Sequence, residues 1–407
     1  MADFAPQARQ SQRFLLLYAL AWAGSAIAYV PFLTILLPVR VSNLAGQGAD
    51  VSWLAYIAFA GAIAASVGNI GFGYLSDITG NRRGWAWAGL LLSSVLLVAT
   101  GAATGLGSLI VLVVCWQLSL NMMLAPLAAW AGDTVPDAQK GLLGGLLAFA
   151  PGLGALSGAA VTMNGLASAD TRLWLVALMV IACVVPLLVA GAPLPVMEAV
   201  GAVAKPDAQA AKPQAQAAKP QGRDGVVLRM WLARLAVQIA EAALFAYLFF
   251  WFRAIDPAVS DNLTARVFSV VLVLSAPAAL LAGRWADTRN RPLVPLVACA
   301  AISAAGLVGM SLSRTLPAAT IAYALFGLAT SVFLALHSTQ TLRVLPRSDR
   351  RGRDLGVFNL TNTVPSLIMP WFTLALVPYF GFSGLFLLFA ALAVVAAVLL
   401  APFARQT

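Results

Sequence analysis

The chain has 407 residues, of which 61% are hydrophobic and only 10% are charged. Soluble globular proteins carry about 25% charged residues, so this composition excludes an ordinary soluble domain and makes the lipid bilayer the expected solvent. The net charge of +10 would favour nucleic-acid binding in a soluble protein, but here the lysines and arginines gather on one side of the apolar runs. That asymmetry predicts a multi-pass inner-membrane protein with both termini in the cytoplasm and no nucleic-acid partner.

Twelve apolar runs are long enough to cross a bilayer, which requires roughly 20 residues for each helix. Glycine and proline occur inside these runs, as membrane helices tolerate, and we predict an all-α membrane protein. The first run is too long for a signal peptide and is expected to be a retained span. The predicted spans cover residues 14–38, 51–75, 85–104, 107–130, 142–163, 173–191, 229–252, 264–283, 293–312, 318–342, 356–377 and 383–402.

A segment of different composition separates the sixth span from the seventh. It repeats Ala-Lys-Pro three times, and the prolines exclude a coiled coil. We predict a six-helix bundle over residues 1–191, a flexible cytoplasmic linker over 192–228 and a second six-helix bundle over 229–407. The linker is expected to act as a tether, with contact to lipid headgroups as the alternative.

Two short signatures recur in the two halves of the chain. Gly73 and Asp77 follow the second span, and Gly283 and Asp287 follow the eighth span at the same spacing. A second pair recurs after the fourth and tenth spans, where a hydrophobic residue and proline precede Lys-Gly or Arg-Gly. Because both signatures occur in order and at equivalent places, they predict two structurally related halves.

The first signature resembles the loop motif of the major facilitator superfamily, which reads roughly G-x-x-x-D-x-x-G-R/K-R/K. Here Asn81 is inserted before the basic pair, and Asn290 stands where the second copy would have glycine; both Gly80 and Asn290 tolerate the left-handed backbone of a helix C-terminus. The resemblance implies gating by the residues that match the motif, with topology marking by loop charges as the alternative. These residues are Gly73, Asp77, Gly80, Arg82, Arg83, Gly283, Asp287 and Arg291.

The same resemblance implies a mechanism and a set of contacts. Two pseudo-symmetric bundles are expected to rock around a site near the bilayer midplane. Gly73 is expected to allow close approach of helix 11, and Asp77 to face the N-terminus of that helix near Gly356, where a carboxylate is favoured by the helix dipole.

A narrower resemblance, to proton- or cation-coupled glycoside symporters including sucrose transporters, rests on two stretches. One runs from Asn121 through Pro126 to Pro136, and the other runs from Leu345 through the segment 352–359 to Pro370. The arginine motif often found in helix 4 of the superfamily is absent, and the helix 5 Gly-Pro motif of antiporters is only echoed by Pro151-Gly152. The direction of transport therefore stays open, with import slightly favoured.

Ionisable residues inside the spans are rare, which makes them functional candidates. Glu241 is the only acid in the middle of a span, Arg234 lies earlier in the same helix, and the only histidine, His337, lies in the tenth span. We predict that Glu241 carries the coupling proton and that Arg234 stabilises its charged form, with His337 as a further participant. The alternatives are a structural Glu241–Arg234 pair, an arginine that reaches the interface and a satisfied buried histidine.

Depth along the helices sets limits on these contacts. At 1.5 Å per residue, Glu241 lies about 10 Å deeper than Arg234, whereas His337 lies near the level of Arg234. A direct hydrogen bond between Glu241 and His337 is therefore not expected.

Helical spacing places Arg234, Gln238, Glu241 and Phe245 on one face of the seventh span. Helix 7 lines the central cavity in the resembled superfamily, and the repeat sets an aromatic stripe of helix 1 across from it. These groups, with amides of helices 4 and 11, are the candidates for stacking on and hydrogen bonding to a polyhydroxy solute. The predicted substrate-binding residues are Tyr18, Trp22, Tyr29, Trp116, Gln117, Asn121, Gln238, Asn359 and Asn362.

The predicted function is secondary transport of a small neutral, glycoside-like solute by proton symport, with proton-coupled efflux of a drug or amphipathic metabolite as the alternative. An enzyme is not expected, because clustered catalytic groups are absent from the sequence. No phosphate-cradling motif occurs, so an ion gradient is the expected energy source. The cysteines all fall inside spans and predict neither a disulfide nor a metal site. We expect no cofactor, a functional monomer, and the solute, protons and lipid bilayer as partners.

Overall fold

The computed structural model describes residues 9–46, 49–194, 223–289, 291, 293–344 and 351–404. Every regular element in these residues is helical. Eleven helical segments are long and apolar enough to span a membrane, and the last of them contains two spans, because Gly381 interrupts it with φ 61° and ψ −171°. The predicted fold, twelve transmembrane helices in two bundles, is confirmed.

The N-terminal bundle follows the predicted spans with two breaks. The first span contains a π turn between Pro31 and Pro38, where proline N–H groups are missing from the helical hydrogen-bond ladder. The fifth span is divided just before Pro151, which occupies the first turn of the second piece. The elements are α1 (Gln12–Pro31), η1 (Phe32–Leu36), α2 (Leu37–Ala45), α3 (Asp50–Thr79), α4 (Arg82–Ala99), η2 (Thr100–Ala102), α5 (Leu106–Thr134), α6 (Asp137–Leu147), α7 (Ala150–Val161) and α8 (Ala169–Ala190).

The C-terminal bundle consists of fewer and longer helices than the N-terminal bundle. Its first helix begins at Arg223, earlier than residue 229, where the span was predicted to begin. Most of the predicted linker lies outside the described residues. The elements are α9 (Arg223–Ile255), α10 (Asp261–Thr288), α11 (Val294–Leu312), α12 (Leu316–Val344) and α13 (Arg351–Ala404).

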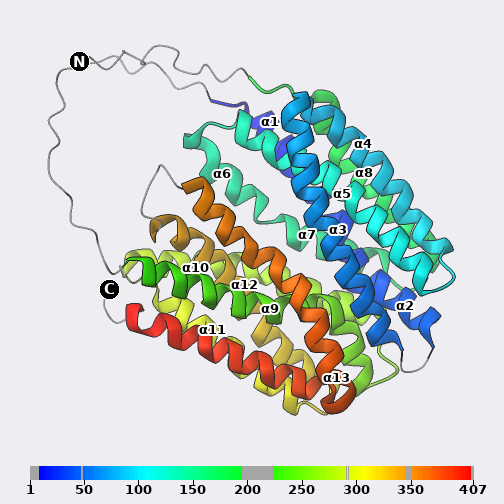
Figure 1. Cartoon of the computed structure of the whole chain (residues 1–407), viewed down its shortest axis with the longest axis vertical. Coiled ribbons are helices and arrows are strands. Elements are labelled where there is room, and N and C mark those ends of the chain that lie inside the picture. Colours follow the sequence, from blue (N-terminus) through cyan, green and yellow to red (C-terminus); the bar gives the residue numbers. More distant parts are fainter. Residues whose placement is uncertain are drawn as a thin grey trace, which may run out of the picture.

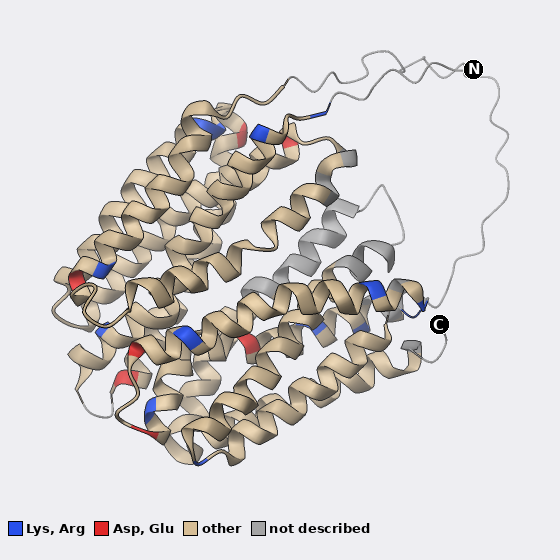
Figure 2. Cartoon of the chain, turned by 180° about the vertical axis from the view of Figure 1, so that it is seen from behind, with Lys and Arg blue, Asp and Glu red and all other residues tan. Residues whose placement is uncertain are grey.

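The two bundles meet at one end and diverge toward the other (Figure 1). We call the end at which α1 and α9 begin the near end, and the opposite end the far end. Contacts between the bundles join α7 to α10, α3 to α13, and η1 and α2 to α9. Lys, Arg, Asp and Glu lie mostly toward the helix ends, and the middle of each bundle is largely uncharged (Figure 2), as expected of helices that cross hydrocarbon.

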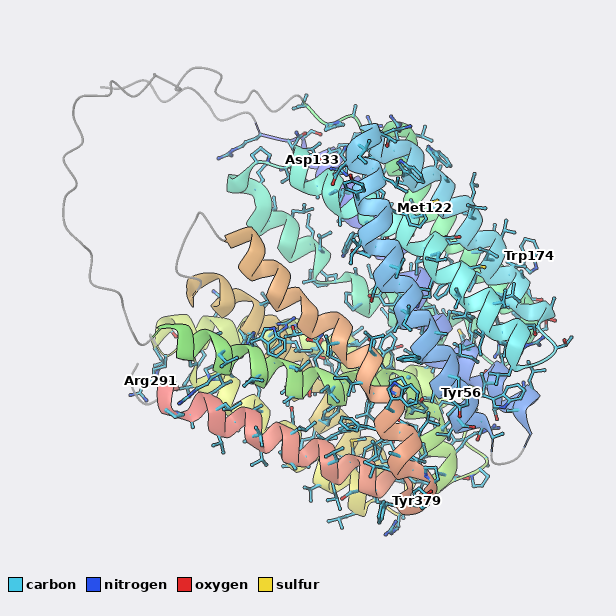
Figure 3. The ribbon with its side chains drawn as sticks, viewed as in Figure 1. Tyr56, Met122, Asp133, Trp174, Arg291 and Tyr379 are labelled. Carbon is cyan, nitrogen blue, oxygen red and sulfur yellow. The ribbon has the colours of Figure 1, made fainter. Side chains whose placement is uncertain are left out.

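Aromatic side chains mark the outer surface near the far end. Tyr56, Trp174 and Tyr379 point away from the bundles (Figure 3) and are 45%, 58% and 80% exposed. Tyrosine and tryptophan favour the membrane–water interface, where an apolar ring and a polar tip are both satisfied. These residues therefore mark the level of one bilayer interface.

Small residues allow the helices inside each bundle to approach closely. Gly306 of α11 faces the backbone of Phe326 in α12, and a Cβ added at Gly306 would lie 2.7 Å from the Phe326 nitrogen. Gly71 of α3, by contrast, has nothing within 4 Å of such a Cβ.

We expect Gly306→Ala to destabilise the protein by roughly 1–3 kcal/mol, because α11 and α12 must separate to admit the methyl group. Thermal unfolding of the purified protein in detergent measures the effect. Gly71→Ala is the matched control and should be neutral or slightly stabilising, since alanine has the higher helix propensity. Equal unfolding temperatures for the two variants would contradict this account of the α11–α12 contact.

Candidate functional site

A cavity of about 920 Å³ lies between the two bundles. Its walls come from α1, η1, α2, α3 and α5 on one side and from α9 and α13 on the other. Most of the lining residues are alanine, leucine, isoleucine, valine and other apolar types. The cavity is large enough for a small organic solute, which commonly occupies sites of about 300–1,000 Å³.

One polar patch of the cavity belongs to the N-terminal bundle. Asn69 of α3 donates its amide N–H to Asn121 Oδ1 of α5 at 3.3 Å, and Asn121 donates to the Gln117 carbonyl at 2.9 Å. Gly68 allows this approach, since a Cβ there would lie 3.2 Å from the Asn121 Cβ. Gln117 and Asn121 were predicted site residues. Asn69 was not, although an amide inside an apolar run is the same kind of signal.

The polar groups of the C-terminal bundle come from α9. Gln238, Glu241 and Phe245 all line the cavity, together with Tyr29 of α1 across from them. Among the described residues, no side chain forms a hydrogen bond or ion pair with the Glu241 carboxylate. Glu241, on the predicted face of this span, therefore lies at the cavity between the bundles, and its carboxylate has no direct partner among the described residues.

Behind Glu241 lies a second, smaller cavity of about 150 Å³, here called the side chamber. Tyr29, Glu241 and Phe245 line both cavities, so these residues form the boundary between them. Residues of α10 and α12 that sequence reasoning did not select close the chamber. They are Phe268, Val271, Leu272, Tyr323, Phe326, Gly327, Thr330 and Ser331.

Arg234 and His337 lie together at the contact between α9 and α12, away from the two cavities. The Arg234 guanidinium donates to Thr361 Oγ1 at 3.0 Å, to Ser338 Oγ at 2.9 Å and to the Leu334 carbonyl at 3.3 Å. His337 is fully buried, with Nε2 2.9 Å from the Met230 carbonyl oxygen. Arg234 attracts the Glu241 carboxylate only at longer range.

The predicted substrate-binding aromatics differ in their placement. Tyr29 lines the cavity. Tyr18 is buried and donates to the Leu127 carbonyl at 2.8 Å, and Trp22 stacks on its ring. Trp116 is fully buried, with its ring against Phe32 at 4.7 Å. Tyr18, Trp22 and Trp116 therefore pack inside the N-terminal bundle. The side chains of the two remaining candidates, Asn359 and Asn362, lie outside the described part of the structure.

The loop signature between α3 and α4 is a compact ion-pair site at the near end. Gly80 ends α3 in the left-handed conformation with φ 61°, as its place in the motif predicts. The inserted Asn81 caps α4, because its Oδ1 accepts the Gly84 N–H at 2.8 Å. Arg82 bridges two carboxylates, Asp77 at 2.5 Å and Asp133 at 3.1 Å.

Other residues of this signature also contact their own bundle. Arg83 donates to the carbonyls of Leu188 and Val189 at the end of α8. A Cβ at Gly73 would first meet Ala125 of α5, at 3.9 Å. In this conformation the described neighbour of Gly73 is thus α5, whereas the resemblance implied helix 11.

The second copy of the signature is described in part. A Cβ at Gly283 would lie 3.4 Å from Leu336 of α12. Arg291 is exposed at the near end of the bundle, and its N–H donates to the Ala286 carbonyl at 2.9 Å. Asn290 and the Asp287 side chain lie outside the described residues.

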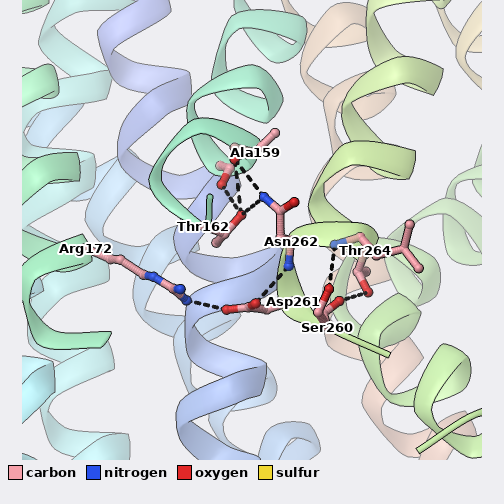
Figure 4. A network of polar contacts seen from close by, with 9 residues as sticks. Ala159, Thr162, Arg172, Ser260, Asp261, Asn262 and Thr264 are labelled. Atoms are coloured by element: carbon pink, nitrogen blue, oxygen red, sulfur yellow. Dashed lines mark hydrogen bonds and ion pairs between the residues drawn. The ribbon is translucent and has the colours of Figure 1, made fainter. Parts of the chain in front are cut away.

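A polar network joins the bundles at the far end (Figure 4). Arg172 of α8 forms an ion pair with Asp261, the first residue of α10. The neighbouring Asn262 amide donates to the Ala159 carbonyl at 3.1 Å and lies 3.3 Å from Thr162 Oγ1, both in or next to α7. Sequence reasoning did not select these residues, because each lies at the polar end of a span, where charges are common.

Comparison with known proteins identifies the architecture. Residues 254–407 match the sequence profile of the Major Facilitator Superfamily. A bacterial homologue of the human lysosomal transporter Spinster, in its inward-facing and unoccupied conformation, has a TM-score of 0.71 and 15% identity, and the match covers 96% of each chain. Such a homologue in its inward-facing and occupied conformation has a TM-score of 0.71 and 14% identity, and the match covers 97% of this chain and 96% of that chain. No curated protein sequence matches. These likenesses establish the fold.

Proposed function

We propose that the chain is a major facilitator superfamily transporter, in accord with its fold and with the profile match over residues 254–407, and that it exchanges a small amphipathic solute for protons across the inner membrane. The observation that carries the proposal is the placement of Glu241. Its carboxylate lines both cavities and lacks a direct partner among the described residues. Carboxylates inside membrane helices are costly and typically mark proton or ion pathways.

The cavity wall supports an amphipathic cargo. Apolar side chains make up most of the lining, and the aromatic groups that were expected to stack on a sugar, Tyr18, Trp22 and Trp116, pack elsewhere. A solute with many hydroxyl groups would leave most of them without partners on such a wall, and each buried unsatisfied polar group costs about 1–3 kcal/mol.

Proton symport of a neutral, glycoside-like solute is the second candidate. It is favoured by the amides of Asn69, Gln117, Asn121 and Gln238, which line the cavity from both bundles. These groups offer donors and acceptors to a few hydroxyl groups without introducing charge.

Alternating access explains how the solute crosses. In this proposal the near end faces the cytoplasm, in accord with the charge asymmetry of the sequence, and a monomer suffices because both walls of the cavity belong to one chain. The ion pairs of Arg82 with Asp77 and Asp133 stabilise the near end of the N-terminal bundle in one conformational state. The second copy of the signature, with Gly283, Asp287 and Arg291, has the same gating role in the C-terminal bundle. The bundles rock about the cavity, opening it to each side in turn.

The test uses proteoliposomes whose membrane potential is clamped at zero. Vesicles with an acidic lumen should accumulate an amphipathic cargo by exchange, whereas symport would fill vesicles with an alkaline lumen. A panel of permanently charged quaternary ammonium compounds and neutral glycosides avoids passive trapping of weak bases, and protein-free vesicles set the background. Accumulation that ignores both gradients would overturn proton coupling.

A further inference from the structure

The side chamber has an unusual combination of lining groups. Five aromatic residues surround it, and the Glu241 carboxylate forms part of its wall. The aromatic residues are Tyr29, Phe245, Phe268, Tyr323 and Phe326. Two pairs of these rings contact each other: the Tyr29 and Phe245 rings are tilted with their centroids 6.4 Å apart, and the Phe245 and Phe268 rings are 5.8 Å apart at 72°.

Aromatic faces carry negative potential, so a cation held among several rings is attracted to them. A carboxylate adds a full negative charge, and in a site shielded from water that attraction is stronger than in solution. A neutral apolar guest has the opposite effect, because it removes water from the carboxylate and offers nothing in return. The wall therefore favours a cation.

The size of the chamber limits the guest. Its volume of about 150 Å³ equals that of an engineered protein cavity that holds one benzene molecule. A group the size of trimethylammonium fits, whereas a whole drug-sized molecule does not. The remainder of a larger solute would extend past Tyr29 and Phe245 into the central cavity, whose wall is apolar.

We propose that the side chamber binds the alkylammonium head of an amphipathic cargo. This inference rests on the proposed transport function and specifies its substrate class. The cation competes with a proton for Glu241: when the head enters, the carboxyl O–H proton leaves to water, and one positive charge in the chamber replaces another. Exchange of one cation for one proton follows directly.

Other charged or titratable groups near Glu241 are few among the described residues. Tyr29 faces it from α1 and Tyr323 from α12, and Arg234 lies about 10 Å away along the axis of α9. The elements α7 and α10 contribute only apolar residues to the chamber, among them Pro151, Phe268, Val271 and Leu272. Glu241 is thus the group whose protonation a bound cation would change.

The test compares choline with its neutral carbon isostere, 3,3-dimethylbutan-1-ol, by ligand-observed NMR titration of the intact protein in detergent. We expect choline to bind at least about tenfold more tightly, and this preference to disappear in Glu241→Gln. Phe268→Leu should weaken choline binding by about threefold to tenfold. Phe382→Leu is the matched control, since Phe382 packs on Phe386 in the same bundle, and it should change nothing.

A second experiment measures the release of the Glu241 proton when choline binds. Calorimetry in two buffers of different ionisation enthalpy should show up to one proton released for each choline bound by the native protein and none for the isostere. Equal affinity for the two ligands, binding of neither, or a preference that survives Glu241→Gln would overturn the inference. Binding without gradient-driven transport would instead count against the proposed function, and transport of a neutral solute alone would count against the inference.

Discussion

Replacing Glu241 with glutamine is expected to reduce solute accumulation driven by a pH gradient to the level of protein-free vesicles. Glutamine keeps the shape and most hydrogen-bonding capacity of glutamic acid but cannot bind and release a proton. Because Glu241 is the carboxylate that lines both cavities in the described structure, no other acid there can replace it. The measurement is uptake into proteoliposomes at zero membrane potential with either sign of gradient.

Two controls make the Glu241 result specific. Asp170→Asn neutralises a carboxylate that is 71% exposed and lies outside both cavities, so coupled transport should persist. Exchange of labelled for unlabelled solute without any gradient separates the two candidate functions. It should survive in Glu241→Gln if amides hold a neutral cargo, and be lost if Glu241 itself holds a cation. Gradient-driven accumulation that survives the substitution would contradict the assignment and direct attention to His337.

Hydropathy alone was sufficient to place the spans, because the bilayer requires each helix to be apolar over a fixed length. Even the break between the last two spans was predicted, where Gly381 adopts a positive φ. The π turn at Phe32–Leu36 and the division of the fifth span before Pro151 were not predicted. Proline inside a membrane helix permits several local geometries, and neighbouring helices select among them.

The site was harder to predict, for a physical reason. Charged and amide side chains inside a span are rare, because placing them in the hydrocarbon of the bilayer costs free energy. Gln117, Asn121, Gln238 and Glu241 were selected for this reason, and they do line the cavity. Aromatic residues are compatible with lipid, helix contacts and cavities alike. Trp116 was predicted to bind the solute but packs inside a bundle, whereas Phe268, which was not selected, lines the side chamber. Because a membrane helix is apolar on all its faces, its sequence does not show which face turns toward a cavity.

Loss of the far-end ion pair between Arg172 and Asp261 is expected to shift the protein away from the conformation described here. The pair joins α8 to α10, and its side chains are only 15% and 18% exposed. Removing one partner leaves the other charge partly buried and unpaired, which costs up to 3–5 kcal/mol in a fully buried site. Because both side chains keep some exposure, we expect a cost of about 1–3 kcal/mol, or roughly a fivefold to 150-fold change in the ratio of the two conformations.

Asp261→Asn is the sharpest variant, because it removes the charge and retains the shape. Distances between spin labels on α7 and α10, measured by pulsed electron resonance, should lengthen at the far end, and the double substitution Arg172→Asp with Asp261→Arg should restore them in part. Asp170→Asn again serves as the matched control, since its carboxylate lies 3.9 Å from Arg40 within one bundle. Unchanged distances in Asp261→Asn would mean that the Asn262 amide, with its contacts to Ala159 and Thr162, holds the bundles together without the ion pair.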